Sequence, residues 1–100
     1  MKYFLLMYDV VPDYVERRIP FRAEHIALAR AANACGDLFL AGALANPVDG
    51  AVLIFKGETA AAAKAFALAD PYVIHGLVTR WRVREWSTVV GDDALVTIPL

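Results

Sequence analysis

His25 and Asp70 are the two side chains of this sequence best suited to moving a proton. A histidine titrates near neutral pH, and a carboxylate bonded to one ring nitrogen fixes its tautomer and raises the basicity of the other nitrogen. Such a pair can take a proton from a carbon beside a carbonyl or hydroxyl group and return it elsewhere. Arg22 stands on the same face of a predicted helix as His25, where its guanidinium group would hold a carboxylate or phenolate.

The same residues also have structural interpretations. His25 would then be a half-buried helix residue bonded to a carbonyl group, and Asp70 would cap a turn. Arg22 would pair with Glu24 or Asp13 at the surface. Residue types alone do not choose between the interpretations, so the choice depends on whether the fold brings His25 and Asp70 together.

Metal and covalent chemistry are not indicated by the sequence. Two histidines and scattered carboxylates make no recognised ligand spacing, and there is no glycine-rich phosphate loop. His75 is expected to be solvated or structural. Cys35 has no base beside it and is expected to be a small buried hydrophobe rather than a nucleophile. We therefore expect no metal and no cofactor.

The length and composition predict one small domain, residues 1–100, with a partner subunit. The chain has 100 residues, of which 59% are hydrophobic, more than an ordinary soluble domain buries alone. A net charge of -1 predicts no attraction to nucleic acid or anionic lipid. No apolar stretch approaches the ~20 residues that cross a bilayer. A single cysteine cannot form an internal disulfide, which favours a cytoplasmic location.

The apolar pattern predicts four strands and two main helices. The strands are expected at residues 2–9, 38–44, 51–56 and 77–86, the helices at 20–35 and 60–69, and a helical lead-in at 14–18. This βαββαβ order is that of the α+β ferredoxin-like plan, an antiparallel sheet with two helices on one face. Because the open face is apolar, we expect a second copy to pack on it as a homodimer, or within a higher oligomer.

Proline and glycine set the predicted boundaries. Pro20 suits the first turn of the first helix, and Gly36 suits a left-handed residue after its last turn. Thr59 is the predicted N-cap of the second helix, which Pro71 ends. Gly42, inside a strand, predicts a bulge or a close approach to the backbone.

Further predictions concern the buried face of the first helix, the arginines of the last strand and the C-terminal segment. The inner stripe of the first helix is predicted from three apolar residues: Ile19, Ile26 and Ala29. Arg80, Arg82 and Arg84 alternate along the last strand, and we expect their heads to lie in water or to pair across a dimer. Residues 95–98 would form a short added strand or an arm that reaches a partner.

The direction of the chain places both motifs at one end of the sheet. If the first strand runs up, the first helix starts at the top and the second helix ends there. With about 1.5 Å of rise per residue, His25 lies about 7–8 Å below a helix start at Pro20. His25 and Asp70 can therefore face each other across a pocket. Tyr8 ends the first strand near the same edge and would donate a proton or hydrogen bond.

Several short motifs occur together between residues 1 and 87. They are Tyr8-Asp9, Arg22-x-x-His25, Gly36-x-Leu38 before Ala41-Gly42, Asp49-Gly50, and Asp70-Pro71-Tyr72 before Gly76-Leu77. Together they resemble the YCII-related (YciI-like) family of small dimeric α+β-barrel proteins, which includes a dehydrochlorinating lyase. The resemblance implies a catalytic pair, His25 and Asp70. Substrate contacts are expected from four residues: Arg22, Tyr8, Gly42 and Tyr72. Residues 88–100 lie beyond the match.

Three functions follow from these predictions. The first is a small cofactor-independent enzyme that uses His25 and Asp70 for isomerisation or elimination on a small cyclic or aromatic acid. The alternative is a non-catalytic dimeric module that binds a small molecule. RNA binding on an RRM-like sheet is disfavoured because the sheet face would be buried in the dimer and the chain is not basic.

Overall fold

The computed structural model describes residues 1–96 and 98 and has an α+β architecture. Its elements in chain order are β1 (Lys2–Val10), α1 (Tyr14–Arg17), the 3₁₀ turn η1 (Ile19–Phe21), α2 (Arg22–Ala34), β2 (Leu38–Ala43), β3 (Gly50–Gly57), α3 (Ala61–Ala69), α4 (Pro71–Ile74) and β4 (Val78–Trp86). The strands form an antiparallel sheet in the order β2-β3-β1-β4. The ferredoxin-like prediction is confirmed.

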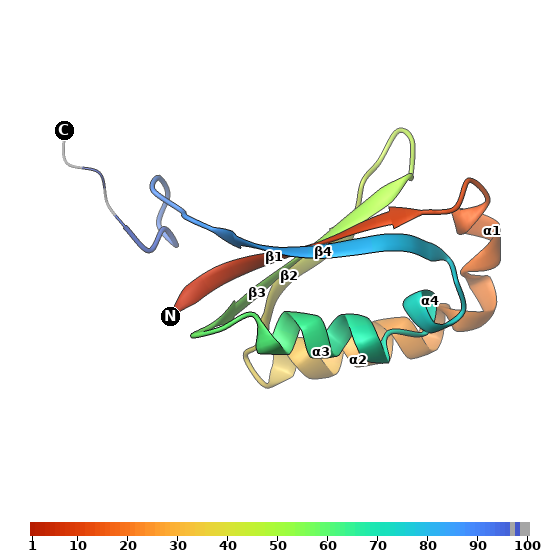
Figure 1. The fold of residues 1–100 in the computed structure, drawn as a ribbon, viewed down its shortest axis with the longest axis horizontal. Helices are drawn as coiled ribbons and strands as arrows, with labels where there is room; N and C mark the ends of the chain where they lie inside the picture. Colours follow the sequence, from red (N-terminus) through yellow and green to blue (C-terminus); the bar gives the residue numbers. More distant parts are fainter. Residues whose placement is uncertain (97, 99–100) are drawn as a thin grey trace.

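The two longer helices, α2 and α3, lie on one face of the sheet, and the opposite face is open (Figure 1). The start of α2 and the end of α3 lie at the same end of the sheet, where β1 ends and β4 begins (Figure 1). The expected convergence of the two motifs at one edge is therefore correct. No helix among the described residues is both long and apolar enough to span a membrane.

The core lies between the sheet and the helices. Alternate residues of β1 point into it, namely Phe4, Leu6 and Tyr8. Phe66 of α3 packs against Phe55 of β3, with ring centroids 5.5 Å apart. Burial of such a side chain contributes roughly 1.5–3 kcal/mol, so these contacts fix α3 against the middle of the sheet.

The open face combines apolar side chains with a row of arginines. Leu5 lies opposite Arg84, and Met7 lies opposite Arg82, so these residues share one face. The three arginines of β4 are exposed. Arg82 Nη1 lies 3.8 Å from Asp9 Oδ2. The arginine heads thus lie in water, and their pairing across a dimer stays a prediction.

The first main helix begins later than predicted. Pro20 lies in η1, where the Phe21 N–H donates to the Arg18 carbonyl oxygen at 2.9 Å, and the α-helix starts only at Arg22. The tighter 3₁₀ turn changes the direction of the side chains before α2. Ile19 is consequently 71% exposed. The prediction that Ile19 belongs to the inner stripe of the first helix was therefore wrong.

The glycine prediction is confirmed at the end of α2 and wrong inside β2. Gly36 has φ +89°, the left-handed conformation expected after the helix. Gly42 pairs regularly with Val52, and nothing lies within 4 Å of a Cβ built there. The register shift of β2 lies between Leu38 and Leu40 instead.

Three further predictions need correction. Cys35 is exposed at the C-cap of α2, where its Sγ lies 3.3 Å from Asp37 Oδ2. The N-cap of α3 is Ala60, although the Thr59 hydroxyl oxygen accepts from the Ala61 N–H at 3.2 Å. Residues 95 and 96 form a bend rather than a strand, and position 97 of the predicted strand lies outside the described residues.

Candidate active site

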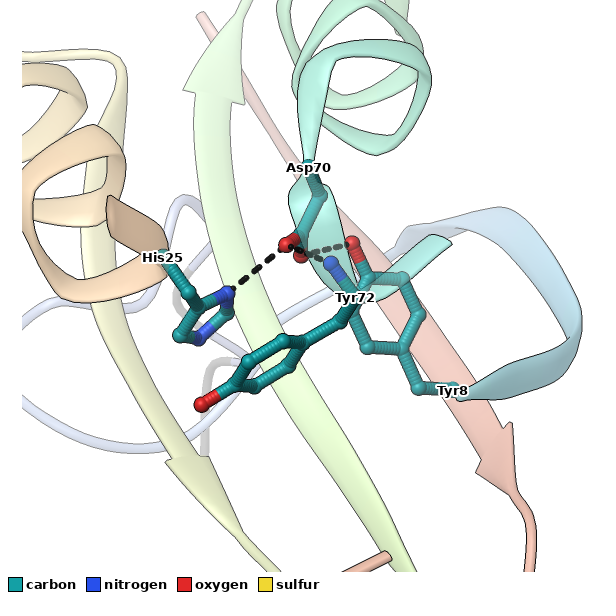
Figure 2. A network of polar contacts seen from close by, with 4 residues as sticks. All are labelled: Tyr8, His25, Asp70 and Tyr72. Carbon is teal, nitrogen blue, oxygen red and sulfur yellow. Dashed lines mark hydrogen bonds and ion pairs between the residues drawn. The ribbon is translucent and has the colours of Figure 1, made fainter. Parts of the chain in front are cut away.

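His25 and Asp70 are in direct contact, with His25 Nδ1 2.9 Å from Asp70 Oδ1 (Figure 2). His25 comes from the beginning of α2, and Asp70 joins α3 to α4. Asp70 is fully buried, whereas 15% of the His25 side chain is exposed. The carboxylate therefore lies behind the imidazole, and the prediction that the two groups face each other across a pocket needs this correction.

Asp70 owes its position to the proline that follows it. Pro71 disfavours helical geometry at the preceding residue, and Asp70 has φ -69° and ψ 122°. Pro71 is also the first residue of α4, whose N-cap is Asp70: Oδ1 accepts from the Tyr72 N–H at 2.9 Å. The capping interpretation is thus correct together with the contact to His25. The sequence pattern does not predict α4, because one helical turn leaves no periodicity.

Tyr8 holds the second carboxylate oxygen. Its hydroxyl group donates to Asp70 Oδ2 at 2.7 Å, and the side chain is buried. Burial raises the pKa of the Tyr8 phenol well above its ordinary range, and the negative charge of Asp70 and the hydrogen bond to it add to this. Tyr8 is not among the described residues that line the cavity beside His25. The predicted substrate contact is therefore replaced by a contact with Asp70.

The partners of Asp70 determine which nitrogen of His25 carries the proton. Both carboxylate oxygens accept hydrogen bonds from neutral donors, Tyr8 and the Tyr72 backbone, as the acceptor-only ionised form does. His25 Nδ1 is therefore the donor toward Asp70, which leaves a lone pair on Nε2. In Figure 2 the second ring nitrogen lies on the side away from the carboxylate. This arrangement leaves Nε2 as the ring nitrogen that is free to accept a proton.

The plane of the imidazole is fixed by aromatic neighbours. The ring of Tyr72 is stacked on His25 with centroids 3.9 Å apart and planes inclined by 8° (Figure 2). Phe66 meets the same imidazole edge to face at 6.3 Å. Stacking and the Asp70 hydrogen bond together leave the imidazole little freedom to turn.

A cavity of about 460 Å³ opens beside His25, between α2 and the β2 edge of the sheet. Four of the predicted site residues line it: Arg22, His25, Gly42 and Tyr72. Its apolar wall comes from α2, β2 and β3 and includes Ile26, Ala29, Ala43, Ala51 and Leu53. The space is large enough for a small ring compound.

The cavity is strongly basic, a property that was not among the predictions. Arg18 and Arg30 line it in addition to Arg22, and no Asp or Glu is among the described lining residues. The available signal for Arg30 was its spacing of eight residues from Arg22, because positions i and i+8 lie on one face of a helix. Arg22 has no ion pair within 4.0 Å among the described side chains, and Asp13 lies 3.9 Å from Arg17 instead.

The remaining histidine is separate from this site. His75 is exposed at the end of α4 and stacks on Phe21, with ring centroids 4.1 Å apart. Within the described ranges, no cluster of three or more His, Cys, Asp or Glu residues is arranged to hold a metal ion.

An alkaline titration would test the burial of Tyr8. Burial also raises the pKa of Tyr72, so both phenols should stay neutral in the folded protein above pH ~10, where a free tyrosine ionises. The unfolded chain then binds fewer protons than the folded one. The contribution of these phenols to the free energy of unfolding is therefore constant below pH ~10 and falls as the pH rises further.

Ultraviolet difference absorbance is the measurement. While both proteins are folded, Tyr8→Phe and the wild type should show the same absorbance change on alkaline titration. After unfolding, the absorbance change of Tyr8→Phe should be smaller than that of the wild type by the amount that one tyrosine contributes. Loss of that amplitude in the folded variant would mean that Tyr8 ionises in place, against the expected burial.

A family model described as YCII-related domain matches residues 1–87. The structure is similar to 5-chloro-2-hydroxyhydroquinone dehydrochlorinase (TftG) from Burkholderia phenoliruptrix AC1100, solved in complex with 2,5-dihydroxybenzoquinone. The TM-score is 0.72 at 22% identity, over 86% of this chain and 94% of that one.

Two further structures are similar at lower TM-scores. One is a protein from Agrobacterium tumefaciens, with a TM-score of 0.55 at 14% identity over 97% of this chain and 100% of that one. The other is a proposed antibiotic biosynthesis monooxygenase from Deinococcus radiodurans, with a TM-score of 0.55 at 15% identity over 99% and 100%. The search of curated proteins gives no match. At these identities the structural likeness establishes the fold.

Proposed function

Because this chain belongs to the YCII-related domain family, we propose that it is a cofactor-independent enzyme of the isomerase or lyase type. Its His25–Asp70 pair would transfer a proton on a small cyclic or aromatic acid. The observation that carries the proposal is the 2.9 Å contact of His25 Nδ1 with a buried carboxylate, beside a basic cavity that His25 itself lines.

The proposed mechanism begins with proton removal by His25 Nε2. The C–H bond of the substrate breaks, its electron pair stays with the substrate, and the imidazole becomes an imidazolium ion. The Asp70 carboxylate stabilises this positive charge through the Nδ1–H bond. A positioned general base of this kind contributes about 10²- to 10⁴-fold.

Two outcomes are open to the intermediate. In an isomerase, the imidazolium ion returns the proton to a different carbon. In a lyase, a leaving group such as chloride departs with its bonding electrons as a double bond forms, and the proton later passes to water. The elimination is supported by the dehydrochlorinase named among the structural neighbours.

Deuterium exchange tests the proposal even while the product is unidentified. Hydroxylated aromatic acids, their chlorinated forms and cyclic lactones are first screened by thermal shift, because a bound ligand raises the melting temperature. Each ligand found is then incubated with the protein in D₂O and followed by NMR. We expect incorporation of deuterium at one carbon, or release of chloride, in the wild type and strongly reduced rates in Asp70→Asn.

A binding module is the alternative, favoured by the three arginines of the cavity. Arg18, Arg22 and Arg30 would hold an organic anion whether or not a proton moves. Ligands that raise the melting temperature but exchange no proton and give no product, with any member of the panel, would support this function.

We further propose a homodimer in the cytoplasm, formed through the open sheet face. Support comes from the apolar side chains there and from a hollow of about 410 Å³ that includes Leu40, Val52 and Ile54. Leu40 is 63% exposed, a costly position for a large apolar residue in a lone subunit. Sedimentation of the wild type as two copies, and of Leu5→Lys as one, is the expected result. A wild-type monomer at micromolar concentration would contradict the proposal.

A further inference from the structure

Among the fully buried side-chain nitrogen and oxygen atoms in the described part of the chain, the Tyr72 hydroxyl oxygen alone has no hydrogen-bond partner. Only 1% of Tyr72 is exposed. Buried polar groups are almost always bonded, because leaving one unpaired loses its bonds to water without replacement. Tyr8 illustrates the rule, since its hydroxyl group donates to Asp70. The unpaired Tyr72 hydroxyl therefore needs a partner from outside the chain.

Its surroundings indicate the charge of that partner. Tyr72 lines the cavity together with Arg18 and Arg22. Burial raises the pKa of the Tyr72 phenol, and the positive charges of Arg22 and Arg18 oppose this change, which places both guanidinium groups within electrostatic reach. Tyr72 therefore remains a neutral donor at neutral pH, next to two cations. An anionic oxygen fits such a set of donors.

Arg18 is held in place by its own neighbour. Its guanidinium carbon lies 5.1 Å from the centroid of the Tyr14 ring, and that ring meets Tyr72 edge to face at 5.6 Å. A cation over an aromatic face is attracted to it. Arg18 is therefore kept near the Tyr72 ring without neutralising its charge.

We infer that Tyr72, Arg18 and Arg22 form an oxyanion site, and that the cavity takes a flat ring whose charged oxygen is bonded to the Tyr72 hydroxyl. The inference deepens the proposed function and rests on it for the identity of the cavity as the substrate site. The parallel stack of His25 and Tyr72 supports it, because the hydroxyl group and the second imidazole nitrogen extend to the same side of the stack (Figure 2). The apolar cavity wall accommodates the rest of the ring.

This geometry gives Tyr72 a role in the proton transfer. When His25 Nε2 removes a proton from a ring carbon, negative charge moves to the oxygen conjugated with that carbon. The Tyr72 hydroxyl and the two guanidinium groups would bond that oxygen more strongly as its charge grows, which lowers the barrier. Tyr72 is then a catalytic residue, and the arginines restrict the cavity to anions.

Tyr72→Phe tests the inference, because it removes only the hydroxyl oxygen and keeps the ring stacked on His25. The probe is 2,5-dihydroxybenzoquinone, an acidic flat ring that is anionic at neutral pH, and its uncharged control is 2,5-dimethoxybenzoquinone. We expect Tyr72→Phe to bind the anionic probe roughly 10- to 100-fold more weakly, as loss of a hydrogen bond to a charged group implies. Arg18→Met and Arg22→Met should weaken binding of the same probe and make this binding depend less on salt concentration.

Two other tyrosines serve as matched controls. Tyr3 is not among the described residues that line the cavity, and its hydroxyl group donates to the Asp93 carbonyl oxygen at 2.7 Å. Tyr3→Phe keeps the ring that packs near Phe39 and should leave probe binding unchanged. Tyr8→Phe removes a satisfied hydroxyl group and should lower the melting temperature by several degrees. Tyr72→Phe should leave the melting temperature of the free protein unchanged or higher, because it removes an unsatisfied group.

The inference is overturned if Tyr72→Phe binds the anionic probe as tightly as the wild type, or if the wild type binds the uncharged control equally well. It is also overturned if the wild type does not bind the anionic probe, or if Tyr72→Phe lowers the melting temperature as much as Tyr8→Phe. Binding is read without turnover, so the result is independent of deuterium exchange. Deuterium exchange could require His25 while Tyr72→Phe binds the anionic probe as tightly as the wild type. That pair of results would reject this inference and leave the proposed function standing.

Discussion

Asp70→Ala is expected to lower the free energy of unfolding by about 3–5 kcal/mol, the largest loss we predict for a single polar side chain of this protein. The variant leaves three donors without an acceptor: the Tyr8 hydroxyl, the Tyr72 N–H and His25 Nδ1–H. Asp70 is fully buried, so water cannot replace the carboxylate without opening the packing around it. Urea denaturation followed by circular dichroism measures the change.

Two variants make the comparison specific. Asp70→Asn keeps one acceptor oxygen and nearly the same volume, so its loss should be clearly smaller. Asp13→Ala removes an exposed carboxylate 3.9 Å from Arg17, and such a pair contributes about 0–1 kcal/mol. Equal losses in Asp70→Ala and Asp13→Ala would mean that the buried carboxylate does not hold the three donors together.

The large effect expected at Asp70 reflects two tasks combined in one residue. Oδ1 caps α4 and bonds His25, while Oδ2 accepts from Tyr8 at the end of β1. The carboxylate thus links a strand and two helices at the edge where the cavity opens. Asp70→Ala would therefore lose stability and the orientation of His25 together, and only Asp70→Asn can separate the two effects.

The strands and the convergence of the two motifs were predictable because they depend on alternation and on chain direction. β1 is a continuous apolar run too short for a helix, and arginines alternate with apolar residues along β4. Gly36 and Pro71 mark helix ends by backbone geometry that few other residues favour. Each of these signals is local in sequence. Once four strands and two helices are placed in order, handedness brings His25 and Asp70 to one edge.

The rest depended on contacts that a linear pattern does not contain. Ile19 faces solvent because a 3₁₀ turn precedes α2, and Pro20 is compatible with either kind of helix. Tyr8 was expected to contact the substrate, but its hydroxyl group donates to Asp70 instead. The position of a residue along a strand does not show how deeply its side chain is buried. Arg18 belongs to the segment before α2, so its place in the cavity depends on the turn at η1.

The position of the proton on His25 determines which ring nitrogen can act as a base. With Nδ1–H donated to Asp70, the free base Nε2 is the only imidazole atom that can accept a proton. A substrate of the proposed reaction would therefore approach from the cavity that His25 lines. His75 offers no such arrangement, because it is exposed and stacked on Phe21, with no carboxylate bonded to its ring among the described residues.

His25→Ala is accordingly expected to slow proton transfer by about 10²- to 10⁴-fold, measured as deuterium incorporation into a ligand identified by the thermal-shift panel. His75→Ala, the matched histidine control, should leave this rate unchanged. Because His25 borders the open cavity, its removal leaves space that added imidazole can enter, and partial recovery of the rate with imidazole would identify the missing group as the base. An unchanged rate in His25→Ala, with the fold intact, would remove His25 from the reaction and leave the anion-binding cavity as the functional feature of the chain.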